Sequence, residues 1–174
     1  MSLKGRLSEA GVTESFPREP FTVDGANGLI ATMEAVLEEI TRLRDLVERD
    51  DKQLQILDAL WGPEVLASEN PDHAEFVRYR AAVDGAVERI QGLVREEIVA
   101  RGVRFPPGGL DHGLLDFPTT LDGRWVYLCW KRGESRVDQW HEISDGFAGR
   151  QPVTSDQESR MGVEGSDPPE APPP

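Results

Sequence analysis

Apolar residues recur every three or four positions from Ala26 to Trp61, as they do along one face of an α-helix. The alternation of threes and fours is typical of a coiled-coil seam, and only Asp50 interrupts it. Thr22 is a suitable N-cap, and Pro63 ends the pattern because proline lacks the amide donor and clashes with the preceding turn. We therefore predict a helix of roughly 40 residues, either continuous or broken near Asp50.

A second apolar stripe runs from Phe76 to Ile98. Asn70 followed by Pro71 is a typical helix start, since the first side chain can cap the helix and proline is already set for its first turn. Gly102 is the expected left-handed residue at the end. The two stripes predict an antiparallel helical hairpin.

After the second stripe, the pattern changes to that of β-strands. Two strands are predicted at residues 114–119 and 124–131, and the Asp-Gly pair before Arg124 is typical of a hairpin turn. A third strand near 136–142 would complete an antiparallel meander. The segment 146–152 is rich in glycine and is predicted to be a loop. The predicted fold class is therefore α+β, a long antiparallel helical hairpin followed by a small antiparallel β-meander.

The two ends of the 174-residue chain differ from the part between them. Residues 154–174 have almost no large apolar side chain and end in proline-rich sequence, which predicts a disordered acidic tail. Residues 1–20 combine mixed charges with Pro17 and Pro20, which indicates a loose leader. We predict a single domain over residues 21–153.

Composition narrows the classes of partner. The formal net charge is −13, and the basic residues are scattered, so neither nucleic acid nor a membrane surface is a predicted partner. No segment has the ~18 apolar residues that a membrane helix needs, and no signal-peptide core is found, so we expect a cytoplasmic protein. The single cysteine excludes an intrachain disulfide and metal sites built on paired cysteines.

Several short motifs follow one another in the second half of the chain. They are Gly113 to Pro118 (GLLDFP), Val126 to Trp130 (VYLCW), Gly133-Glu134, Trp140-His141 and Gly146 to Pro152 (GFAGRQP). In this order they resemble a prokaryotic domain of unknown function, family 2203, and the helix entry from Phe21 to Asn27 is similar as well. The resemblance implies a long helical hairpin followed by strands, and it implies no activity. The chain departs from the family pattern at 105–109, where a Pro-Gly insertion replaces a strand-like lead-in.

The candidate catalytic residues are Asp116, Glu134 and His141. Two carboxylates and an imidazole could hold Zn²⁺, Mn²⁺ or Fe²⁺ and leave positions for a water that the metal acidifies for hydrolysis. Further candidates in the same region are Asp111, His112 and Arg150. The alternative is structural: Asp116 caps a turn, Glu134 lies at a hairpin tip, and His141 forms ordinary hydrogen bonds. Because the spacing matches no known metal motif, no cofactor is predicted, with a divalent metal as the alternative.

Other nucleophiles are less favoured. Cys129 lies mid-strand, where a thiol usually behaves as a small buried apolar group, and Ser135 and Ser144 lack the sharp turn that exposes a nucleophile. Arg150 is also a candidate anion-binding residue, because it lies in a glycine-rich loop. We favour the other interpretation of that loop, in which Phe147 packs onto the sheet and Arg150 pairs with an acid.

The apolar arc of the first helix is wider than one partner helix can cover. The hairpin is therefore predicted to be a protein-binding or self-assembly module that forms a homodimer or binds another protein. The predicted interface residues are Leu29, Ile30, Leu37 and Leu43. The alternative function is a small metal-dependent or acid/base hydrolase that uses Asp116, Glu134 and His141.

Overall fold

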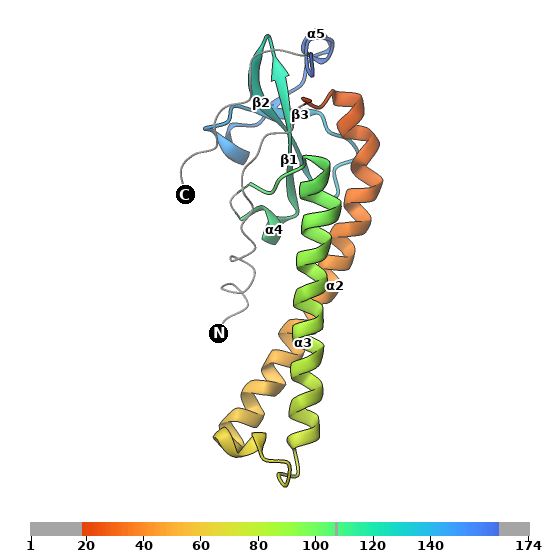
Figure 1. Ribbon diagram of the computed structural model, residues 1–174. Helices are drawn as coiled ribbons and strands as arrows, with labels where there is room; N and C mark the ends of the chain where they lie inside the picture. Colours follow the sequence, from red (N-terminus) through yellow and green to blue (C-terminus); the bar gives the residue numbers. More distant parts are fainter. Residues whose placement is uncertain (1–18, 107, 164–174) are drawn as a thin grey trace. The chain divides into compact units, whose positions relative to one another are not determined.

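The computed structural model describes residues 19–106 and 108–163, in which helices come first and a sheet follows (Figure 1). The chain divides into two compact units. We call Glu38–Arg95 the hairpin unit, and we call the described residues 19–37 and 96–163 together the sheet unit. Among the described residues, no helix is both long and apolar enough to cross a membrane.

The first helix, α2 (Val23–Trp61), is continuous over 39 residues, so it does not break near Asp50. The predicted cap is confirmed, because the Thr22 hydroxyl accepts a hydrogen bond of 3.0 Å from the Gly25 amide. Asp50, the polar residue that interrupts the apolar seam, is buried, and its Oδ1 lies 2.8 Å from Nε of Arg49. The ion pair compensates the buried carboxylate and allows the helix to continue.

In the hairpin unit, α2 is followed by the short helix η1 (Gly62–Leu66) and by α3 (His73–Leu93). Arg89 on α3 is close enough to Glu39 on α2 to lower its pKa, and Asp50 on α2 is close enough to Tyr79 on α3 to raise its pKa. The residue number on α3 falls as the number on α2 rises, so the two helices are antiparallel. The predicted hairpin is thus confirmed.

The ends of α3 differ slightly from prediction. The Asn70 side chain accepts a hydrogen bond from the Asp72 amide at 2.9 Å, as in a turn. The helix begins at His73, two residues after the predicted first helical residue, Pro71. At the other end, α3 continues as η2 (Val94–Ile98) and η3 (Val99–Arg101). Gly102 then adopts the predicted left-handed conformation, with φ of 79°.

The sheet has four antiparallel strands in the order β1-β2-β3-β4. They are β1 (Leu114–Leu121), β2 (Arg124–Lys131), β3 (Gln139–His141) and β4 (Gln151–Pro152). The turn between β1 and β2 is formed by Asp122 and Gly123, which both have positive φ, as a two-residue hairpin turn requires. The meander is confirmed, but the prediction of a plain loop at 146–152 is wrong. That segment forms the helix η4 (Gly146–Gly149) and the short strand β4.

The beginning of α2 is joined to the sheet within the sheet unit. The Asn27 side chain donates to the Val137 carbonyl at 3.2 Å and accepts from the Val137 amide at 2.9 Å. The Phe21 amide donates to the Pro118 carbonyl, and the rings of Phe21 and Phe117 meet edge to face. The helix-entry residues of the family resemblance therefore connect α2 to the strands.

The boundary predicted for the C-terminal tail is placed too early. Residues 154–163 include the helix α5 (Ser155–Glu158), whose cap Thr154 forms a capping box with Gln157. Met161 is buried and forms a β-bridge with Leu121. The rest of the predicted tail, 164–174, lies outside the described residues, and so do residues 1–18 of the predicted leader.

Two of the four residues of the predicted interface on the first helix are not exposed in the single chain. Leu37 and Leu43 are buried in the single chain, while Leu29 and Ile30 are half-buried. The prediction assumed that the strands are too short to cover α2, with their folding back over the helix as the alternative. The first part of α2 instead packs within the sheet unit, so its apolar arc has a second element to cover it.

Candidate functional site

Four residues lie opposite one another in a row across the sheet. The row consists of Arg104, Asp116, Cys129 and Gln139. Residues paired directly across strands point to the same face, and so do residues two apart on one strand. His141, two residues after Gln139, therefore lies on the same face as Asp116 and Cys129.

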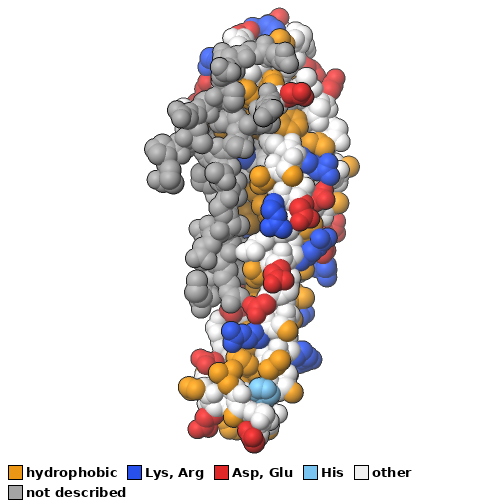
Figure 2. Space-filling model, in the orientation of Figure 1, with side chains coloured by type: hydrophobic (Ala, Val, Ile, Leu, Met, Phe, Trp, Pro, Cys, Tyr) orange, Lys and Arg blue, Asp and Glu red, His pale blue; other side chains and the backbone are white. Residues whose placement is uncertain are grey.

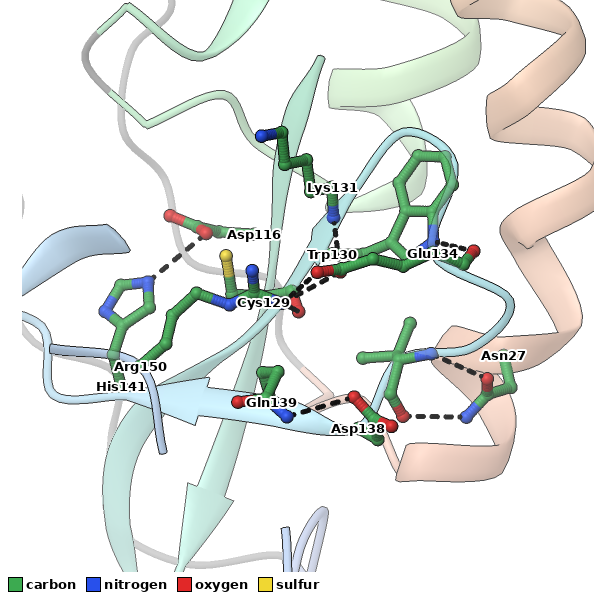
Figure 3. A network of polar contacts seen from close by, with 11 residues as sticks. Asn27, Asp116, Cys129, Trp130, Lys131, Glu134, Asp138, Gln139, His141 and Arg150 are labelled. Atoms are coloured by element: carbon green, nitrogen blue, oxygen red, sulfur yellow. Dashed lines mark hydrogen bonds and ion pairs between the residues drawn. The ribbon is translucent and has the colours of Figure 1, made fainter. Parts of the chain in front are cut away.

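Asp116, Cys129 and His141 form a compact polar cluster inside the sheet unit (Figure 3). Their ligand atoms all lie within 4.8 Å of one another. The closest pair is His141 Nε2 and Asp116 Oδ1, which are 3.3 Å apart. The three residues are at most 1 % exposed. We call these three residues the sheet cluster.

The hydrogen bonds of His141 determine which of its ring nitrogens carries a proton. Nδ1 lies 2.7 Å from the Glu142 carbonyl oxygen, which can only accept, so Nδ1 must carry the hydrogen. Burial of the ring favours the neutral form, but the hydrogen bonds to Asp116 and to the Glu142 carbonyl outweigh burial and raise the pKa of His141. The Asp116 carboxylate therefore favours a positive charge beside Nε2.

Cys129 is in an environment that keeps it protonated in the metal-free protein. Burial first, and then the negative charge of Asp116, raise the pKa of the Cys129 thiol to about 12. Such a thiol is not a nucleophile near neutral pH, because the thiolate is the reactive form. The prediction that Cys129 is a buried thiol is confirmed.

Arg104 supplies the positive charge next to the sheet cluster. Its Nε lies 3.5 Å from Asp116 Oδ2, and its Nη1 donates to the Tyr127 hydroxyl at 2.7 Å. The guanidinium also lies over the Tyr127 ring, 4.2 Å from the centroid. Arg104 thus balances the charge of a carboxylate that is completely buried. The Pro-Gly insertion begins just after Arg104, which is still paired with β1.

Glu134 does not join Asp116 and His141 as predicted. Both of its carboxylate oxygens accept hydrogen bonds of 2.8 Å from Nη2 of Arg150. The same Arg150 nitrogen lies 3.4 Å from the Cys129 carbonyl oxygen (Figure 3). The proposed ligand set of Asp116, Glu134 and His141 is therefore split, because the acidic side chain in the turn pairs with the loop arginine instead.

The favoured interpretation of the glycine-rich loop had two parts, an ion pair of Arg150 and the packing of Phe147 onto the sheet, and the structure agrees with the first. Arg150 pairs with an acid, as predicted, so an anion bound there would have to displace Glu134. Phe147, however, is 44 % exposed and does not fill the sheet. It lies under the Arg150 guanidinium, whose centre is 4.9 Å from the ring centroid.

Cys129 is the member of the sheet cluster that sequence reasoning left out. Asp111 and His112, the further candidates, are exposed on α4 (Gly109–His112) and do not take part in it. A usable signal was present in the chain. Counting outward from the two-residue turn at Asp122 places Asp116 opposite Cys129.

The comparison with known families agrees with this architecture. A family profile described as uncharacterized conserved protein (DUF2203) matches residues 19–153, from just before α2 to just after β4. The chain belongs to DUF2203. The resemblance recognised from the sequence motifs is thus confirmed. No curated protein and no solved structure matches the chain.

A second feature of this DUF2203 protein lies in the hairpin unit. Hydrophobic side chains appear on the surface at the end where α2 turns through η1 into α3 (Figure 2). Four large apolar side chains of this segment are exposed, and we call them the tip surface. They are Ile56 (51 % exposed), Leu60 (67 %), Leu66 (58 %) and Val77 (49 %). The segment from Ile56 to Val77 contains five acidic residues and no lysine or arginine. The tip surface is therefore apolar with acidic neighbours.

Proposed function

We propose that this DUF2203 protein is a protein-binding module that uses the tip surface to dock its partner. The observation that carries the proposal is the exposure of the four tip side chains, because exposed groups of large apolar side chains usually mark an interaction site. Ile56 and Leu60 are one helical turn apart on α2, so they share one face. They form the natural centre of such a site.

The charges near the tip favour one class of partner. Asp58 on α2 is exposed, and so are Glu64 and Glu69 between α2 and α3. The whole chain carries a net charge of −13. A protein with an apolar patch bordered by lysine or arginine would complement this surface. A second copy would bring like charges together, so self-assembly, the other form of the predicted module, is disfavoured at low salt. The two forms therefore respond in opposite ways to salt.

The alternative function has less support. Hydrolysis by Asp116, Glu134 and His141 would need the three side chains to meet and to reach a substrate. Glu134 is bound by Arg150, and the other two are at most 1 % exposed. We also propose a cytoplasmic location, which the single reduced Cys129 supports.

The test combines capture with direct titration. The full chain, immobilised, is exposed to a lysate of its source organism, and each captured protein is identified, purified and titrated against the free chain. Leu60→Asp is expected to weaken the binding of the true partner about tenfold or more, and higher salt is expected to weaken it as well. Ile143→Asp is the matched control, because Ile143 is 42 % exposed but lies in the sheet unit.

The outcomes separate the two forms. A partner whose affinity falls with Leu60→Asp, and does not fall with Ile143→Asp, supports the proposal. A partner unaffected by Leu60→Asp would overturn it. A dimer of the chain itself, seen by light scattering and strengthened by salt, would overturn the basic partner in favour of self-assembly through the same tip.

A further inference from the structure

We propose that the sheet cluster binds a divalent zinc ion through a carboxylate oxygen of Asp116, the Cys129 sulfur and the His141 Nε2. This inference is independent of the tip surface. The three donors are oxygen, sulfur and nitrogen, a set that suits Zn²⁺. They come from three neighbouring strands, so a bound ion would join β1, β2 and β3.

The distances fit a small tetrahedral ion. With the usual zinc bond lengths, neighbouring ligand atoms on a tetrahedral ion are about 3.3 to 3.6 Å apart. His141 Nε2 and Asp116 Oδ1 already have this separation, at 3.3 Å. All ligand atoms of the cluster lie within 4.8 Å of one another, so the sulfur would need to move by about 1.2 Å at most to complete the set. Rotation of a side chain is enough for such a movement.

The protonation of His141 gives a second, independent reason for a cation at this place. Since Nδ1 donates its hydrogen to the Glu142 carbonyl, a neutral ring has only a lone pair at Nε2. That lone pair faces a carboxylate oxygen, which also has no hydrogen to donate. Two acceptors 3.3 Å apart in a buried site need a positive ion between them, either a proton or a metal.

The surroundings supply the outer contacts that metal ligands usually have. A carbonyl that accepts from the far ring nitrogen of a histidine fixes its tautomer and orientation, and Glu142 does this for His141. Arg104 Nε forms an ion pair of 3.5 Å with the other oxygen of Asp116, and Arg104 Nη1 donates to the Tyr127 hydroxyl. Zn²⁺ would replace two protons, the one on the Cys129 thiol and the one between Asp116 and His141, so the exchange adds no net charge to the core.

The burial of the cluster indicates a structural ion. Three protein ligands leave a fourth position, but the ligands are at most 1 % exposed, so a substrate has no direct access to them. An ion held by three strands would be released only when the sheet opens. Zinc binding should therefore raise the melting temperature of the chain, because the unfolded state lacks the assembled site.

The test uses the full chain, freed of metal by dialysis against a chelator. Zn²⁺ is titrated in competition with a chromophoric chelator, and Co²⁺ is added in a separate experiment as a spectroscopic probe. We expect one ion per chain and a near-ultraviolet charge-transfer band from sulfur to cobalt. Because Cys129 is the single cysteine, the band assigns the sulfur ligand without any substitution.

Three variants test the remaining ligands and the specificity. Cys129→Ser and His141→Gln should each lower the Zn²⁺ affinity by about 100-fold or more, since losing an outer-shell partner already costs up to that much. His112→Gln is the matched control, because His112 is exposed on α4. The Zn²⁺ affinity of this variant should equal that of the unaltered chain. Circular dichroism shows whether each variant is folded, and the cobalt band of the unaltered chain decides the matter if one is not.

The opposite result is equally clear. If a proton rather than a metal lies between Asp116 and His141, the full chain will bind no stoichiometric Zn²⁺ and its melting temperature will not respond to zinc or chelator. Absence of the sulfur-to-cobalt band, or equal binding by Cys129→Ser, would also overturn the proposal.

Discussion

In the sheet unit, a carboxylate, a thiol and an imidazole lie inside the fold, whereas in the hairpin unit four large apolar side chains lie outside it. Buried polar groups and exposed apolar groups are both unusual in a folded protein, but they differ in what they cost the free energy of folding. An exposed leucine forgoes about 1.5 to 3 kcal/mol of burial, but nothing in the folded chain depends on it. A buried charge without a partner costs several kcal/mol, so the buried Asp116 carboxylate requires Arg104 and His141 beside it. Substitutions should therefore be costly in the sheet cluster and harmless to folding at the tip.

The largest expected effect concerns the reactivity of Cys129. In the metal-free folded chain, burial and Asp116 raise the pKa of the thiol from its ordinary value of 9.0 to about 12. Near pH 8 the thiolate is then about 1,000-fold scarcer than in an ordinary thiol, and alkylation should be slowed at least as much. Mass spectrometry after iodoacetamide treatment, with and without urea, measures the two rates. Rates within tenfold of each other would mean that the sheet unit exposes its polar interior.

Removal of the Asp116 carboxylate should be the most destabilising change in the sheet cluster. Asp116→Ala leaves Arg104 without its ion-pair partner and His141 without its acceptor, in a core where both are held. We expect a loss of about 3 to 5 kcal/mol in the free energy of unfolding, measured by urea denaturation of metal-free protein. The control Asp156→Ala removes an exposed ion pair with Arg160 and should cost less than about 1 kcal/mol. Similar losses in both variants would mean that the buried carboxylate matters no more for folding than an exposed one.

Two leucines of the hairpin unit give a matched pair on one helix. Leu43 is 6 % exposed and Leu60 is 67 % exposed, and both lie on α2. Leu43→Ala should cost about 2 to 5 kcal/mol, because it leaves a cavity. Leu60→Ala should change the stability by no more than about 0.5 kcal/mol. Equal effects in urea denaturation would show that the tip surface is covered within the chain, and the proposed docking site would then fail.

Most of the fold could be predicted because local patterns determine it. The period of the apolar residues predicts α2 and α3, and the Asp122-Gly123 pair predicts the hairpin between β1 and β2. β4 was missed because a two-residue strand has no pattern of its own and exists through pairing with β3. The tail boundary was wrong for a similar reason, since the burial of Met161 depends on a bridge to distant Leu121.

The candidate site was predicted only in part. Asp116 and His141 were correctly grouped, because neighbouring strands bring them to one face. Glu134 was grouped with them wrongly, because the direction of a side chain in a turn depends on its partner, here Arg150. Cys129 was interpreted as a buried apolar group because a single residue does not show which residue lies opposite it on the next strand. Pairing opposite Asp116 gives Cys129 its polar neighbours.

The entry to α2 and the segment after α5 are attached to the same strand. Phe21 receives a hydrogen bond from the Thr119 hydroxyl at its carbonyl, and Thr120 exchanges bonds with Gly162 and Val163. A Cβ on Gly162 would lie 2.7 Å from the Phe21 carbonyl oxygen, so the two attachments touch. A pulling force applied between these points would load β1 and its short bonds directly. The hairpin unit, which lies between these two points along the chain, would carry no tension until the hydrogen bonds to β1 had broken.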